Sequence, residues 1–84
     1  MINPIRRWLD RRRADDEARI EFVLHASPDL PGLQIAHWTR IGIGRLHVVL
    51  ARMETAGRVT SRWEPGPYPR RRLYQLAQPT EETP

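Results

Sequence analysis

The chain has 84 residues and no cysteine, and its fourteen basic residues against ten acidic ones give a formal net charge of +4. One domain of this size has a small core, and the lack of cysteine excludes disulfides and thiolate metal sites. No stretch approaches the roughly 20 apolar residues of a membrane span, and no nucleophile–base pair, phosphate loop or metal-ligand set is recognisable. We therefore expect a soluble cytoplasmic protein that is not an enzyme and has no metal and no cofactor.

The charges are segregated along the chain. Residues 1–13 hold five arginines and one acid, residues 14–29 hold one arginine and five acids, and residues 40–72 hold eight arginines and two acids. The middle of the chain therefore has a local charge of +6. A basic cluster of this kind favours an anionic partner.

The first segment, residues 1–14, is predicted to be a basic amphipathic helix. Asn3 is a good N-cap, and Pro4 is tolerated at the first helical position. Ile5, Trp8 and Leu9 share one face. Three roles remain open for this face: it closes the back of the core, forms a dimer contact, or belongs to a basic arm that touches DNA.

A second helix is predicted to start at the acidic residues 15–17 and to end before Pro28. One of its stripes holds Ile20, Val23 and Leu24, while Phe22 lies nearly opposite. A helix with two apolar faces packs between two partners. We expect one partner to be the following helix pair and the other to be the N-terminal face, from this chain or from a second copy. The residues of a possible homodimer contact are Ile5, Trp8, Leu9 and Phe22.

The next region predicts a helix-turn-helix. Residues 29–32 are expected to form a short connection with at most a strand of two or three residues. A short helix over 33–39 and a turn at 40–42 with Ile41 pointing inward are predicted to follow. Many such turns have glycine where Arg40 stands, because the backbone there is left-handed. A longer helix is predicted over about 43–56, with Gly57 as its C-terminal left-handed residue.

That second helix has two distinct faces. Its apolar positions recur at helical spacing, which predicts that they face the core; they are Leu46, Val49, Leu50 and Met53. The opposite side consists of small residues interrupted by arginine. Such a surface suits close approach to a partner, and arginine favours an anionic one.

After Gly57 the apolar period changes from that of a helix to that of a strand. Two strands are predicted, over residues 58–63 and 73–76. The stretch 64–72 contains three prolines and cannot lie in a central strand. We interpret it as an arginine-tipped wing joining the strands, and residues 78–84 as a disordered tail. The predicted fold class is α+β, a winged helix-turn-helix domain over residues 15–77 with three to four helices and a hairpin of two or three strands.

The stretch from Gly44 to Trp63, followed by residues 69–76, resembles the winged-helix domain of PadR-type transcriptional regulators and, more loosely, of MarR-type regulators. In that family the recognition helix begins with a glycine and has an aromatic residue three positions further on, where this chain has His47. PadR-type proteins also have C-terminal dimerisation helices, and we expect this chain to lack them. The resemblance implies a DNA-binding transcriptional regulator of bacterial or phage type, which would be nucleoid-associated.

We therefore predict sequence-specific binding of double-stranded DNA, with helix 43–56 in the major groove and wing 64–72 on the backbone or in a minor groove. Two alternatives stay open: an architectural, excisionase-like factor that bends DNA, and a winged-helix module that binds an acidic protein. The candidate DNA-binding residues are Gly44, Arg45, His47, Val48 and Arg52 on the helix, Thr39 and Arg40 at the turn, and Arg62, Tyr68, Arg70, Arg71 and Arg72 on the wing.

Overall fold

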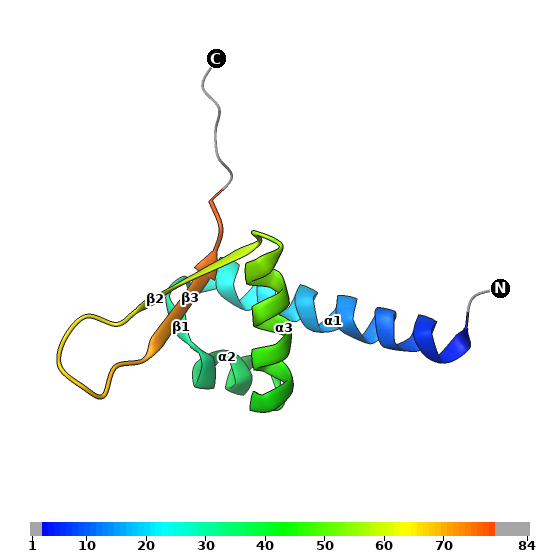
Figure 1. Cartoon of the computed structure of the whole chain (residues 1–84), viewed down its shortest axis with the longest axis horizontal. Helices are drawn as coiled ribbons and strands as arrows, with labels where there is room; N and C mark the ends of the chain where they lie inside the picture. Colours follow the sequence, from blue (N-terminus) through cyan, green and yellow to red (C-terminus); the bar gives the residue numbers. More distant parts are fainter. Residues whose placement is uncertain (1–2, 79–84) are drawn as a thin grey trace, which may run out of the picture.

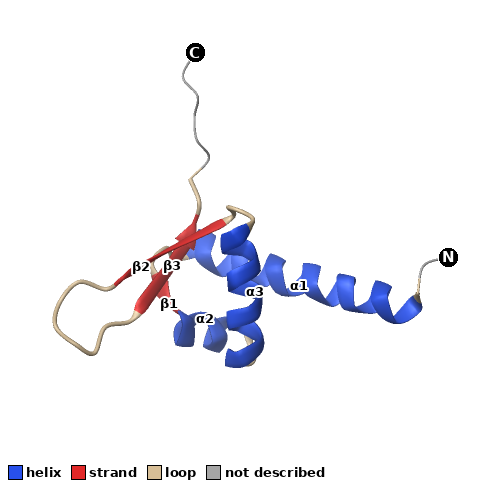
Figure 2. Ribbon diagram, viewed as in Figure 1, coloured by secondary structure: helices blue, strands red, loops and turns tan. Residues whose placement is uncertain are grey.

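The computed structural model describes residues 3–78, which form three helices and a three-stranded antiparallel sheet (Figure 1) (Figure 2). The predicted α+β class is confirmed. Residues 79–84, most of the predicted tail, lie outside the described part of the chain. The elements in order are α1 (Pro4–Ala26), β1 (Leu30–Pro31), α2 (Gly32–Thr39), α3 (Ile43–Thr55), β2 (Val59–Trp63) and β3 (Arg72–Leu76).

The N-terminal region is one continuous helix of 23 residues, so the prediction of two separate helices was wrong. The Asn3 side chain accepts a hydrogen bond from the Ile5 N–H at 2.9 Å and caps the helix as expected. No glycine or proline interrupts the sequence between Ile5 and Ala26. The acidic residues near position 15 therefore continue the helix instead of starting a new one, and Asp16 among them is buried.

The two halves of α1 have different surroundings. Ile20 and Leu24 in the C-terminal half are buried in the core, whereas every residue from position 3 to position 15 is exposed. Figure 1 shows the N-terminal half projecting away from the rest of the domain. Trp8 is 55% exposed and does not close the core, so this expected role was wrong. Because the helix is continuous, its N-terminal face cannot fold back onto its own C-terminal half.

The helix-turn-helix has the predicted geometry. Arg40 caps α2 in the left-handed region with φ 60°, and Ile41 points inward with 2% of its surface exposed. The Thr39 hydroxyl donates to the Ile35 carbonyl at 2.7 Å and accepts from the Ile41 N–H at 3.3 Å. These hydrogen bonds stabilise the turn that sets the direction of α3.

The core lies between the three helices and the sheet. All four apolar residues predicted for the inner stripe of α3 are buried, at 4% exposure or less. The helix ends at Thr55, and Gly57 beyond it adopts the predicted left-handed conformation, with φ 77°. Its N–H donates to the Glu54 carbonyl, and the Arg58 N–H donates to the Met53 carbonyl, which is the hydrogen-bond pattern of a Schellman C-cap. The core residues are Ile20, Leu24, Ile35, Ile41, Leu46, Val49, Leu50, Met53, Val59 and Tyr74.

The sheet has the strand order β1-β3-β2. Leu30 pairs with Tyr74 on one side of β3, and Val59 pairs with Leu76 on the other side. The predicted alternation in β2 holds from Val59, which is buried, to Arg62, which is exposed like Thr60; it fails at Trp63, which is 55% exposed. Residues 64–71 connect β2 and β3 as a wing that extends beyond the sheet (Figure 1).

Candidate functional site

The outward face of α3 is a ridge of small side chains. Gly44, Ala51 and Thr55 are exposed, and Val48 keeps 52% of its surface accessible. A Cβ atom added at Gly44 would meet no other atom within 4 Å. Arg52 is exposed at the edge of this ridge and forms no ion pair with a carboxylate of residues 3–78. The ridge therefore permits close approach of a partner to the helix backbone.

Arg45 lies on the side of α3 that faces α1. Its Nε and Nη2 atoms donate to the two carboxylate oxygens of Asp16, each at 2.9 Å. The Asp16 side chain is 5% exposed and the Arg45 side chain 38%. A two-point ion pair of this kind holds the guanidinium plane in one orientation. A base contact by Arg45, as predicted, would have to compete with Asp16.

The two turn residues have different environments. Thr39 is 5% exposed, and its hydroxyl is engaged in the hydrogen bonds described above. Arg40 is exposed beside the start of α3, and no ion pair links it to another described residue. Of this pair, Arg40 is the side chain with access to a partner.

The opposite side of α3 faces α2 and the wing. His47 is exposed, and its Nε2 lies 3.2 Å from the position of a Cβ at Gly32, so the imidazole packs over the first residue of α2. Glu54 accepts a hydrogen bond from the Ser61 hydroxyl at 2.7 Å and lies 3.6 Å from Arg72. The contacts of Glu54 connect the C-terminal half of α3 to the base of the wing.

The wing carries paired and unpaired guanidinium groups. Arg71 forms an ion pair of 2.7 Å with Glu64. This hydrogen bond lowers the pKa of the Glu64 carboxyl below its usual value and raises the pKa of Arg71. Arg70 instead lies over the Tyr68 ring, 4.7 Å from its centroid, and Tyr68 is 83% exposed. Arg70 is half-buried, and its Nη2 donates to the Tyr68 hydroxyl at 3.3 Å, so the two side chains form one unit on the wing with Tyr68 as its exposed part.

Several ion pairs between distant segments were not predicted. Arg58 contacts Glu17 at 2.8 Å and also Glu21, and Arg62 contacts Asp29 at 3.3 Å. The segregation of acids into residues 14–29 and arginines into residues 40–72 was the signal that could have indicated them. Five of the eight arginines in the second segment have a carboxylate partner; they are Arg45, Arg58, Arg62, Arg71 and Arg72.

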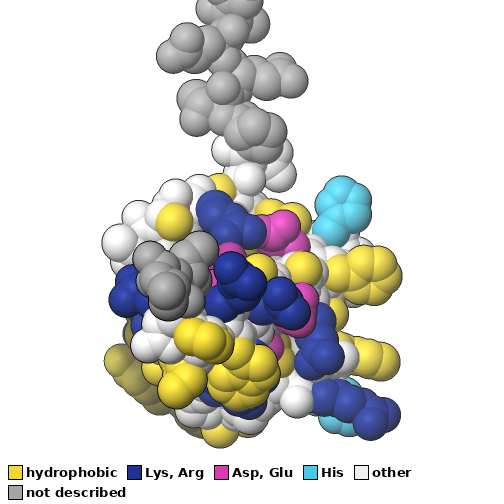
Figure 3. Space-filling model, turned by 90° about the vertical axis from the view of Figure 1, so that its right-hand side faces the viewer, with side chains coloured by type: hydrophobic (Ala, Val, Ile, Leu, Met, Phe, Trp, Pro, Cys, Tyr) yellow, Lys and Arg dark blue, Asp and Glu magenta, His cyan; other side chains and the backbone are white. Residues whose placement is uncertain are grey.

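The N-terminal half of α1 is different, because none of its arginines forms an ion pair with another described residue. Figure 3 views the molecule from the side to which α1 projects and shows arginine side chains gathered in the middle of this face, with hydrophobic side chains beside them. The apolar residues predicted for a dimer contact are accessible, with exposures of 69% for Ile5, 55% for Trp8, 48% for Leu9 and 78% for Phe22. The arginines of this half are Arg6, Arg7, Arg11, Arg12 and Arg13.

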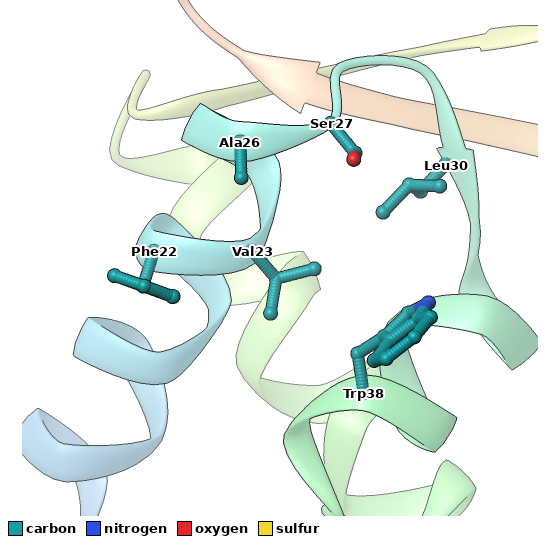
Figure 4. A pocket seen from close by; sticks show the side chains of 6 residues that line it. All are labelled: Phe22, Val23, Ala26, Ser27, Leu30 and Trp38. Atoms are coloured by element: carbon teal, nitrogen blue, oxygen red, sulfur yellow. The ribbon is translucent and has the colours of Figure 1, made fainter.

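An apolar groove of about 300 Å³ lies between the C-terminal half of α1 and α2. In Figure 4, Val23 of α1 and Trp38 of α2 point toward one another, and Leu30 of β1 closes the far side. Trp63 does not line this groove; the Arg72 guanidinium lies 5.4 Å from the centroid of its ring. The groove offers an apolar contact surface on the side of α1 that does not face α3.

Within residues 3–78, no group of three or more histidine, cysteine, aspartate or glutamate side chains is arranged to hold a metal ion. None of the helices in this part of the chain is long and apolar enough to cross a membrane.

The order of three helices, the left-handed turn between α2 and α3, and the hairpin with its wing define a winged helix-turn-helix domain. The structure is similar to that of Stf76 from the Sulfolobus islandicus plasmid-virus pSSVx, with a TM-score of 0.64 and 21% sequence identity; the match covers 74% of this chain and 80% of that chain. No family model and no curated protein matches the sequence. The comparisons therefore support the fold, while the PadR-type resemblance stays a prediction.

Proposed function

We propose that this chain binds double-stranded DNA through α3 and acts as a small transcriptional regulator. The observation that carries the proposal is the ridge of Gly44, Val48, Ala51 and Thr55, which is exposed along α3 and bordered on its α1 side by Arg45 and Arg52. An α-helix with short side chains fits the major groove, which is about 12 Å wide. In helix-turn-helix proteins that bind DNA, the second helix of the helix-turn-helix lies in the major groove.

The residues of α3 would then have distinct roles. Val48 is placed for an apolar contact with a thymine methyl group, and Arg52 for a guanine edge or a phosphate. Gly44 and Ala51 allow the backbone to come close. Because Arg45 is held by Asp16, we assign it a positioning role: it fixes the orientation of α3 relative to α1.

The wing supports the same proposal from the other side of the helix. Tyr68 is exposed on the wing with the half-buried Arg70 against its ring, and Arg70 has no carboxylate partner within residues 3–78. A guanidinium and an exposed aromatic side chain fit phosphates or a minor groove beside the site. Arg62, Arg71 and Arg72 are paired with carboxylates, so we expect weaker contributions from them.

The experiment is a titration onto random-sequence duplex DNA by fluorescence anisotropy at several salt concentrations. We expect log affinity to fall by about 0.9 per log unit of salt for each phosphate contacted. Val48→Glu puts a negative charge on the ridge without entering the core, and should weaken binding by about a hundredfold, since like charges brought together cost several kcal/mol. His25→Glu adds the same charge to an exposed residue in the last turn of α1 and serves as the matched control. Failure of the wild type to bind at low salt would refute the proposal.

We further propose that the chain pairs with a second copy through α1. Trp8 and Phe22 lie two full heptads apart on one exposed stripe, with Asp15 midway between them. In an antiparallel pair of α1 helices centred on Asp15, Trp8 of each copy would meet Phe22 of the other, as a two-fold interface requires. A dimer would favour operator-style regulation, whereas monomers loading on repeats would favour an architectural role.

A further inference from the structure

A second groove, of about 180 Å³, lies between the N-terminal half of α1 and α3. Arg12 and Arg13 of α1 line one wall, and Arg45 and Arg52 of α3 line the other, with Leu9 among the apolar side chains between them. Four arginine side chains from two helices therefore line one depression. The groove exists because α1 continues beyond the half that is buried in the core. This continuous helix was not predicted from the sequence.

The charges in this groove are poorly compensated. Asp16 is the only acid that lines it, and its two oxygens are occupied by Arg45. Arg12, Arg13 and Arg52 have no carboxylate partner among residues 3–78, and Arg12 lies over the Trp8 ring, 5.3 Å from its centroid. Like charges that are brought together without a counter-charge repel one another. A bound anion would relieve this repulsion.

The groove is continuous with the proposed DNA-binding ridge. Val48 and Arg52 belong to both surfaces. A helix with its side chains is about 10–12 Å across and nearly fills a major groove about 12 Å wide, so phosphates pass directly beside such a helix. On the α1 side of α3, the groups that would meet those phosphates are Arg12, Arg13 and Arg52.

We propose that this groove binds the phosphodiester backbone of one DNA strand while α3 occupies the adjacent major groove. The inference rests on the proposed DNA binding and adds a contact made by α1. Most wing arginines are already paired with carboxylates, so this side of α3 supplies a larger share of the phosphate contacts than the wing. The projecting half of α1 thus acts as a basic arm fixed to the domain by a continuous helix.

The test compares two double variants that remove the same charge from the same helix. Arg12→Gln with Arg13→Gln changes the groove, and Arg6→Gln with Arg7→Gln changes exposed positions outside its lining. Affinity for one duplex is measured between 50 and 200 mM salt. If both groove arginines contact phosphates, the slope of log affinity against log salt falls by about 1.8, so over this range the wild type loses about twelvefold more affinity than the groove variant. The control variant is expected to keep a slope close to that of the wild type.

The outcomes separate this inference from the proposed function. Equal slope changes in the two double variants would mean that only the total charge matters, and would refute the proposal that the groove contacts phosphates. An unchanged slope in the groove variant, with the wild type still bound to DNA, would also overturn it while leaving DNA binding intact. A wild type that does not bind would refute the proposed function itself. Arg52→Gln tests the opposite wall and should lower the slope by about 0.9; no change would exclude α3 from the groove contact.

Discussion

Removing the ion pair between Arg45 and Asp16 should destabilise the protein and uncouple α3 from α1. The pair joins a carboxylate that is 5% exposed to a guanidinium that is 38% exposed, through two hydrogen bonds of 2.9 Å. The three variants needed are Arg45→Gln, Asp16→Asn and the double substitution. Together with the wild type they form a double-mutant cycle, which isolates the interaction between the two side chains.

The expected magnitude follows from the unequal burial of the partners. Breaking a fully buried pair costs about 3–5 kcal/mol, because one charge stays buried without a partner. An exposed pair contributes about 0–1 kcal/mol. With Asp16 buried and Arg45 partly in solvent, we expect Arg45→Gln to cost about 2 kcal/mol and the coupling energy to be about 1–2 kcal/mol, between those two limits.

The assay is urea unfolding of the four proteins at one pH and salt concentration, with equal m-values required for the comparison. A coupling energy below about 0.5 kcal/mol, the usual scatter of additivity, would show that the pair is not held in solution. Arg45 would then be available to read a base, as the sequence predicted. A binding titration adds an independent check, since Asp16→Asn removes a negative charge beside the groove and should raise the affinity for DNA.

Three further predictions concern pH, the end of α3 and assembly. Burial raises the pKa of the Tyr74 phenol above its ordinary value near 10, so the folded state keeps this proton longer than the unfolded state does. The contribution of Tyr74 to the free energy of unfolding is therefore fully present below pH about 10 and is lost as the pH rises toward the folded-state pKa. Tyr74→Phe should remove this decline in urea unfolding measured against pH, and an unchanged decline in the variant would contradict the prediction. Gly57→Ala should cost about 1–2 kcal/mol because its φ is 77°, whereas Gly44→Ala, at an open helical position, should be neutral or stabilising; equal effects on thermal unfolding would refute this reasoning. Trp8→Ala should convert a dimer into a monomer in light scattering, and a dimer that survives the substitution would show that α1 is not the interface.

The elements around the helix-turn-helix were predictable because local rules and tertiary packing agree there. The inner stripe of α3 follows helical periodicity, and it is the stripe that the core buries. Gly57 ends α3 because glycine adopts the left-handed conformation without steric cost. Arg40 shows the limit of residue preference, since a non-glycine residue accepts the same conformation where the turn requires it. The three prolines of the wing predicted that residues 64–72 do not form a central strand, and β2 and β3 lie before and after the wing.

The errors arose where the decisive contacts are between residues far apart in the sequence. A cluster of acids is favourable at a helix start, but nothing in the local sequence showed that Asp16 would be neutralised by Arg45 from another helix. The same contact explains why an arginine on the apparent DNA-binding face is held against α1. Closing the core was one of the three roles left open for Trp8, but the continuous helix carries this residue beyond the core. Charge segregation predicted an anionic partner, but pairing with the chain's own acids decides which arginines remain to bind it.

Amide chemical-shift mapping by NMR, with duplex DNA added at low salt, tests the central claim most directly. The account predicts shifts along the ridge of α3, at Arg70 in the wing, and at Arg12 and Arg13 in α1, all of which reverse when salt is raised. Residues that line the apolar groove, such as Val23 and Leu30, should stay unchanged. Shifts confined to that groove, or no shifts at all, would contradict DNA binding through α3.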